Sequence, residues 1–238
     1  DMENERPMSR LLQGDVGSGK TAVALAALLS TVANGYQGAF MAPTEILAQQ
    51  HFNTISLILE GLPRPAIHEN WSTFYLDPFP RPLSVGILIG SHSSKQKREV
   101  QEMMAQGALD IVVGTHALLQ QGVEIPRLAL AVVDEQHRFG VMQRASLRQK
   151  GETPHLLVMS ATPIPRSLAL TLYGDLDLSV LDELPQGRQV IQTRLVHPER
   201  RPDAHEFLRR EVKQGRQAFV VCPLIEESEV LQTRAATT

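Results

Sequence analysis

Eight residues near the start of the chain have the types and spacing of a phosphate-binding loop. They match the pattern G-x-x-x-x-G-K-[ST] in full and read Gly14-Asp15-Val16-Gly17-Ser18-Gly19-Lys20-Thr21. Glycines let the backbone turn tightly, so that its N–H groups point inward at the N-terminus of a helix and hold phosphates. In such a loop Lys20 reaches the β- and γ-phosphates, and the Thr21 hydroxyl ligates Mg²⁺. The pattern therefore predicts a site for a nucleoside triphosphate.

A pair of acids follows an apolar run later in the chain. Residues Leu128–Val133 are all apolar, and Asp134 and Glu135 come directly after them. In an open parallel sheet, ligands bind outside the carboxyl ends of the strands. We expect Asp134 to hold Mg²⁺ and Glu135 to orient and polarise the attacking water. Taken alone, the two acids could also cap the helix expected to begin near Val141; with the phosphate loop, they predict hydrolysis.

Three further segments place small hydroxyl residues after expected strands. Thr44 follows the second strand, Gly114 and Thr115 follow the fourth, and Ser160 and Thr162 follow the sixth. Such groups grip phosphate without reading bases. Helix capping explains each segment singly, whereas their joint occurrence indicates a phosphate-contacting edge.

Alternating apolar runs and helical patterns must position these residues, and the alternation predicts βαβ units with a parallel sheet. The expected strands are Arg10–Gln13, Gly38–Met41, Val85–Ile89, Asp110–Val113, Leu128–Val133 and His155–Met159. The expected helices are Lys20–Ala33, Glu45–Leu59, Ser94–Ala105 and Val141–Lys150. The resulting fold class is α/β, a P-loop NTPase with helices on both faces of its sheet.

The pattern restarts near residue 186, after a linker at Leu184–Gly187. Val190–Val196 and Gln217–Cys222 are expected strands, and Pro202–Gln214 is an expected helix that Gly215 ends. We therefore expect a first domain at 1–185 and the incomplete start of a second α/β domain at 186–238. The single cysteine, Cys222, is interpreted as a small apolar residue of its strand and suits a reducing compartment.

Residues 62–82 interrupt this scheme. Five prolines fall in the segment together with the only tryptophan, Trp71. Because proline does not fit the interior of a sheet or helix, we expect a surface loop or disordered insertion. The alternatives are a nucleic-acid-stacking lid that uses Trp71, Phe74 and Tyr75, and a faulty gene model.

Bulk properties set only broad limits. The 238 residues are 42% hydrophobic and 21% charged, as in ordinary globular proteins. No apolar run approaches the roughly 18–20 residues that a membrane span needs, so no membrane partner is expected. The formal net charge of −3 gives no global electrostatic reason to expect nucleic acid, so any such partner must be argued from local motifs.

The motif set resembles that of superfamily 2 helicases. Gly14–Thr21, Ala42–Leu47, Gly114–His116, Asp134–Gly140 and Ser160–Arg166 are similar to motifs I, Ia, Ib, II and III. More narrowly, Leu11–Thr21, Asp134–Gly140 and Ala161–Arg166 resemble the RecG family, and Val221–Ser228 resembles the start of its second motor domain. The resemblance covers nearly the whole chain except residues 62–82 and the last few.

The resemblance implies an ATP-dependent DNA helicase that uses Mg²⁺ and remodels branched or forked duplex DNA in recombination and repair. Both domains would be RecA-like: a helicase ATP-binding domain and a partial helicase C-terminal domain. It also implies a reducing, DNA-containing compartment, namely the bacterial cytoplasm and its nucleoid.

Residue roles follow from the same resemblance. Gln136 and His137 would link the γ-phosphate site to Ser160 and Thr162. Thr44, Gly114 and Thr115 would contact the DNA sugar-phosphate backbone. Coupling or DNA-side roles fall to Arg138, Phe139 and Arg166.

The departures of this sequence from the RecG pattern leave other functions open. The chain shows no wedge domain before its motor and no motifs V and VI with their catalytic arginine, and the insertion at 62–82 is foreign to the pattern. We therefore expect the fragment alone to be weakly active or inactive. The alternatives are a truncated, non-catalytic remnant that only binds nucleotide or DNA, and the motor of the related transcription-repair coupling factor.

Overall fold

The chain divides into two units, Asp1–Arg188 and Gln189–Thr238. The first unit contains a mainly parallel sheet. The computed structural model of the chain describes residues 1–4, 6–63, 66–77, 79–119, 122–134, 154–162, 176–183 and 191–221. In the first unit the strands are β1 (Ser9–Gly14), β2 (Gln37–Met41), β3 (Trp71–Phe74), β4 (Leu83–Leu88), β5 (Ile111–Gly114), β6 (Leu128–Asp134), β7 (His155–Ser160) and β8 (Asp177–Leu181). The helices over the described residues of this unit are α1 (Lys20–Ala33), α2 (Glu45–Ile58), α3 (Ser94–Ala105) and the short 3₁₀ helix η1 (His116–Leu119).

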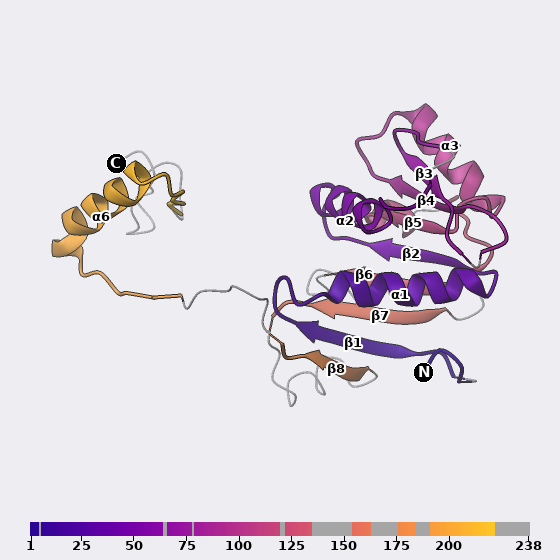
Figure 1. The fold of residues 1–238 in the computed structure, drawn as a ribbon, viewed down its shortest axis with the longest axis horizontal. Helices are drawn as coiled ribbons and strands as arrows, with labels where there is room; N and C mark the ends of the chain where they lie inside the picture. Colours follow the sequence, from indigo (N-terminus) through magenta and orange to yellow (C-terminus); the bar gives the residue numbers. More distant parts are fainter. Residues whose placement is uncertain are drawn as a thin grey trace. The chain divides into compact units, whose positions relative to one another are not determined.

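The eight strands lie in the order β3-β4-β5-β2-β6-β7-β1-β8. Figure 1 shows this order from β3 near the top to β8 at the bottom. Every pair is parallel except β3–β4, which is antiparallel. The α/β fold class and the predicted parallel sheet are therefore confirmed.

Helices cover both faces of the sheet. Alternate side chains of a strand point to opposite faces, so Phe40 joins a core cluster with Leu28 of α1 and Ile55 of α2. The next residue, Met41, joins a second cluster with Met104 of α3. The buried strands thus contribute apolar side chains on both faces, as expected for a parallel sheet between helices.

Local signals predicted the helix boundaries well. The bounds predicted for α1 and α3 match the observed ones, and α2 ends at Ile58, one residue earlier than predicted. The ends have clear causes: Ser93 and Gln96 form a capping box before α3, and Gly35 follows α1 with a φ of 82°. The predicted helix Val141–Lys150 lies outside the described residues.

Two strands of the first unit were not predicted. Residues 62–82 contain β3, which pairs antiparallel with β4 at the edge of the sheet, so the interpretation of the segment as a loop is wrong for Trp71–Phe74. Prolines are tolerated there because they lie outside Trp71–Phe74 and because an edge strand has one unpaired side. The side chain of Phe74 is fully buried, which excludes it from the stacking lid. At the opposite edge, β8 pairs parallel with β1.

In the second unit the described residues form η3 (Pro198–Arg200) and α6 (Arg201–Lys213). The predicted helix is confirmed within one residue. The predicted strands are wrong over the residues described, because 191–197 and 217–221 have no regular structure and are exposed. Val190 and Cys222 lie outside the described residues. A strand needs a neighbour for its N–H and C=O groups, and the described part of this unit provides none.

Candidate functional site

The predicted site residues converge at the carboxyl edge of three adjacent strands. In the register of β6 and β7, Asp134 is the partner of Met159. In the register of β7 and β1, the next residue, Ser160, is the partner of Gln13. Asp134, Ser160 and the start of the phosphate loop therefore end neighbouring strands at the same level. Ligands of open parallel sheets bind at such an edge.

The phosphate loop connects β1 to α1. Gly19 precedes the helix with a φ of 91°, a left-handed conformation that favours glycine. No side chain of the described residues caps this helix, and its first turn contains no acid. The first N–H groups of a helix have no partner within the helix. The N-terminus of α1 is thus suited to an anion supplied from outside.

Two side chains show how the loop is arranged. Nζ of Lys20 donates to the carbonyl oxygens of Gly14 and Asp15, at 2.7 Å each, so the ammonium group lies over the loop. The hydroxyl of Ser18 is buried and has no hydrogen-bond partner among the described residues. A Cβ added to Gly14 would lie 2.5 Å from that hydroxyl, so the close approach requires glycine. Val16 extends into solvent at the tip.

Asp134 ends β6 and is only 8% exposed. Its Oδ2 lies 2.6 Å from Nε2 of His51, which comes from α2, 83 residues earlier. Sequence reasoning did not identify His51. A signal was present, because His51 falls on the same helical face as the buried residues Ala48 and Ile55.

The oxygen groups present fit Mg²⁺ in chemistry and in number. Mg²⁺ prefers oxygen ligands and takes one or two carboxylates, with substrate phosphates and water completing its shell. Asp134 offers a carboxylate, and the partly buried Thr21 offers a hydroxyl at the end of the loop. Among the described residues, no group of three or more His, Cys, Asp or Glu side chains could hold a metal ion. This donor set suits a metal that arrives with its phosphates.

Ser160 and Thr162 form a small hydroxyl cluster after β7. Their hydroxyl oxygens are 3.0 Å apart, and the Thr162 amide donates to Oγ of Ser160. Ser160 is buried at the sheet edge, whereas Thr162 is exposed. The pair is therefore joined to the same edge as Asp134 while presenting one hydroxyl to solvent.

Two of the three residues expected at DNA, Thr44 and Thr115, act as local caps in this structure. Oγ1 of Thr44 accepts from the Leu47 amide at the start of α2. Oγ1 of Thr115 accepts from the Ala117 amide, and Thr115 is 2% exposed. Gly114 is packed so closely that an added Cβ would lie 2.5 Å from the Leu88 carbonyl oxygen. Next to them, His116 is the exposed group.

Glu45 ties the start of α2 to the loop after β4. Its Oε1 accepts from the Ser91 amide at 3.1 Å. Hydrogen bonding from Ser91 lowers the pKa of the Glu45 carboxyl, with further lowering from Gly90. These hydrogen bonds therefore favour the ionised form of the Glu45 carboxyl.

The remaining predicted site residues lie outside the described part of the chain. They are Glu135, Gln136, His137, Arg138, Phe139 and Arg166. Their roles stay predictions.

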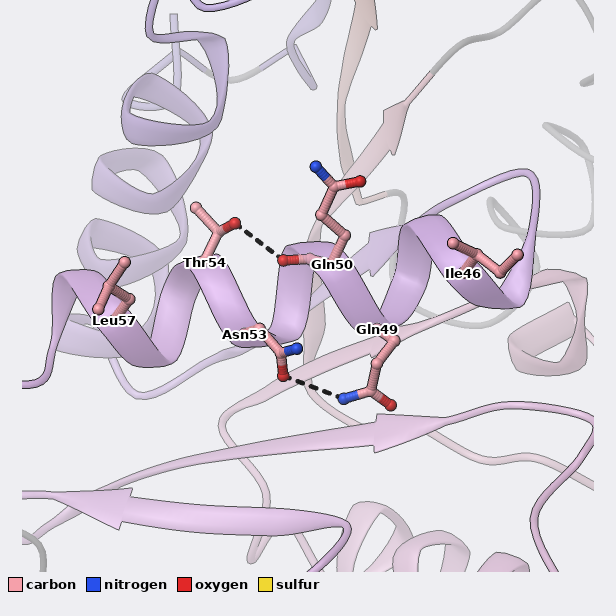
Figure 2. A pocket seen from close by; sticks show the side chains of 6 residues that line it. All are labelled: Ile46, Gln49, Gln50, Asn53, Thr54 and Leu57. Carbon is pink, nitrogen blue, oxygen red and sulfur yellow. Dashed lines mark hydrogen bonds between the residues drawn. The ribbon is translucent and has the colours of Figure 1, made fainter. Parts of the chain in front are cut away.

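A hollow lies along the outer side of α2, away from the described residues of the phosphate loop. It has a volume of about 450 Å³ and is lined by Ile46, Gln49, Gln50, Asn53, Thr54 and Leu57. Figure 2 shows that these side chains all come from α2 and that Gln49 and Asn53 are hydrogen-bonded to each other. None of the lining residues is one of the predicted nucleotide ligands.

In the described residues no helix is long and apolar enough to cross a bilayer.

The chain is similar in sequence to known proteins. Curated relatives named ATP-dependent DNA helicase RecG are 48% identical over 236 residues in both Synechocystis sp. and Bacillus subtilis (strain 168). The matches cover 99% of this chain but 26% and 32% of those proteins, so the chain spans about a third or less of their length.

A comparison with solved structures also finds a RecG protein. A structure of RecG bound to a three-way DNA junction has a TM-score of 0.72 and 43% identity, covering 94% of this chain and 28% of that one. The helicase MrfA bound to DNA is 20% identical with a TM-score of 0.52, over 74% of this chain and 25% of its own, and supports the fold alone. The family description DEAD/DEAH box helicase matches residues 4–171, which is more than half of the chain. The chain therefore belongs to the DEAD/DEAH box helicase family.

Proposed function

We propose that this chain is the nucleotide-binding motor of an ATP-dependent DNA helicase of the RecG type, which couples MgATP hydrolysis to the remodelling of branched DNA. One observation carries the proposal: the phosphate loop, Asp134 and the Ser160–Thr162 pair lie at one edge of three neighbouring strands. The similarity to RecG proteins supports the choice of DNA as partner. The cell compartment that follows is the bacterial cytoplasm and its nucleoid.

Within this function the chain's own residues divide the work. The backbone of Gly14–Thr21 and the N-terminus of α1 bind the phosphates, and Lys20 leaves its two carbonyl partners to neutralise them. Thr21 and Asp134 would hold Mg²⁺, which when bound supplies charge neutralisation to the phosphates. Glu135 would orient the attacking water. Ser160, Thr162, Gln136, His137 and Arg166 would transmit the state of the nucleotide site.

The domain assignment belongs to the same proposal. Residues 1–185 form the helicase ATP-binding domain, and residues 186–238 are the first part of a second RecA-like domain. The chain has no Gln-x-x-Gly-Arg-x-Gly-Arg-like segment. Arginines of this kind stabilise the transferring phosphoryl group and contribute roughly 10³–10⁵ to the rate. We therefore expect slow hydrolysis from the isolated chain, and strong DNA-stimulated hydrolysis by it would contradict this part of the proposal.

The test uses the intact protein that carries this chain, with ATP hydrolysis and the conversion of a forked duplex as readouts. Glu135→Gln should retain nucleotide binding and lose turnover, because it removes the group that orients water while keeping its size. Glu124→Gln, at an exposed position before β6, is the matched control and should behave as wild type. Turnover retained in Glu135→Gln would remove Glu135 from this role. An intact protein that binds nucleotide but never hydrolyses it would favour a non-catalytic remnant.

A further inference from the structure

The only described side-chain partner of Asp134 is a histidine from another element. His51 Nε2 and Asp134 Oδ2 are 2.6 Å apart, and the two side chains are 13% and 10% exposed. A carboxylate oxygen only accepts hydrogen bonds, so Nε2 carries the proton and donates. The bond joins α2 to the end of β6.

The surroundings of His51 fix the direction of this donor. The neighbouring residue on α2, Phe52, is buried in the core, and so is Ile55 one turn on. The His51 ring also contacts the ring of Phe40 on β2, with 4.4 Å between centroids and an interplanar angle of 41°. The imidazole is therefore held between a core helix and a core strand, with Nε2 directed at one oxygen of Asp134.

We propose that His51 is a positioning residue for the metal site: it holds Oδ2 of Asp134 and leaves Oδ1 for the Mg²⁺ shell. The inference rests on the proposed function, in which Asp134 holds Mg²⁺. Carboxylates that ligate metals are themselves commonly hydrogen-bonded, and loss of such a partner costs roughly 10–100-fold in metal affinity or activity. A free carboxylate would instead rotate about its terminal torsion, which has broad preferences.

The test measures the metal's contribution to nucleotide affinity in the full 238-residue chain. A fluorescent ATP analogue is titrated once with Mg²⁺ and once with EDTA, and the ratio of the two Kd values is called the metal gain. His51→Ala should lower the metal gain roughly 10-fold or more while the Kd in EDTA is unchanged. His51→Gln should restore most of the gain, because its amide Nε2 donates from nearly the same position.

A matched control lies two residues further along α2. Asn53 is on the outer side of the helix, where its side chain bonds only to Gln49 among the described residues (Figure 2). Asn53→Ala should leave both Kd values unchanged. Circular dichroism of each variant shows whether α2 and the sheet are intact.

Two results would overturn the proposal. An equal loss of affinity with and without Mg²⁺ in His51→Ala, or no recovery in His51→Gln, would show that His51 only packs. Asp134→Asn separates this failure from failure of the proposed function. If that variant keeps the full metal gain, Asp134 is not a metal ligand, and both proposals fall together; if it loses the gain while His51→Ala keeps it, only the role of His51 is rejected.

Discussion

Two apolar segments of similar character behave differently in the two units. In the first unit, β2 lies between β5 and β6, and its residues Gln37–Met41 are all buried. In the second unit, residues 217–221 include Phe219, Val220 and Val221, which are 90%, 75% and 92% exposed. Both segments are apolar after an initial glutamine, and residues 217–221 contain more of the strand-favouring types, Phe and Val, than β2 does.

The difference lies in the neighbours. A strand leaves its backbone groups unpaired until another strand arrives, whereas a helix pairs them within itself. The helix α6 is therefore present in the second unit although no residue of it is buried. Helices follow from local sequence, and strands follow from partners that the sequence places far away.

The comparison predicts the largest change in the free energy of unfolding for substitutions at two phenylalanines, one in each unit. Phe40 on β2 is fully buried, and Phe219 is 90% exposed. Phe40→Ala should lower the free energy of unfolding by about 3–5 kcal/mol, because it leaves a cavity in the core. Phe219→Ala should change it by less than about 0.5 kcal/mol. Urea unfolding followed by circular dichroism measures both, and equal effects would contradict the comparison.

Substitutions at two aspartates, one in each unit, should show a smaller difference in the free energy of unfolding. Asp110 is 2% exposed and accepts from Arg81 and from the amide and hydroxyl of Ser84. Asp203 on α6 pairs with Arg200 at an exposed position. Asp110→Ala should cost about 1–3 kcal/mol because it leaves the Ser84 amide without its carboxylate. Asp203→Ala should cost at most about 1 kcal/mol, as exposed ion pairs do, and a larger loss there would show that the second unit is more tightly packed than described.

The smallest predicted effect depends on pH. Nδ1 of His155, at the start of β7, accepts from the Met8 amide at 2.8 Å, and burial lowers the pKa of His155 below its ordinary value of 6.5. Its contribution to stability is therefore complete above pH 6.5, begins to fall below that value, and levels off below the lowered pKa of the folded state.

Unfolding curves between pH 5 and 8 test this prediction. His155→Asn keeps an acceptor for Met8 but does not titrate, so part of the fall in stability below pH 6.5 should disappear. The exposed His205 on α6 provides the control, and His205→Asn should leave the fall unchanged. An unchanged fall in His155→Asn would exclude His155 as its source.

The parts of the fold that were predictable are those with local signals. Gly19, the Ser93–Gln96 box and Gly35 mark helix ends in the sequence itself, and the run Leu128–Val133 is long enough to mark a buried strand. The strand β3 was missed because prolines surround it, and only its pairing with β4 makes Trp71–Phe74 a strand. The strand β8 was missed because its burial is partial and because Asp177 and Ser179 interrupt its apolar pattern.

The site likewise combines features that local sequence predicts with features that depend on residues far apart in the chain. The phosphate loop and the position of Asp134 at the end of a strand follow from motif and context. The bond between His51 and Asp134 could not be predicted, because it joins residues 83 positions apart through two packed elements. Capping, one of the two explanations that the sequence offers for Thr44 and Thr115, is observed at both residues.

The most direct test of the account is nucleotide affinity at the phosphate loop. The full chain is titrated with a fluorescent ATP analogue and Mg²⁺, as wild type, Lys20→Ala and the exposed control Lys95→Ala. Lys20→Ala should weaken binding roughly 10- to 100-fold, since it removes a charged hydrogen-bond donor from the phosphates, and Lys95→Ala should bind as wild type does. Equal affinity in wild type and Lys20→Ala would contradict the assignment of Gly14–Thr21 as the phosphate site.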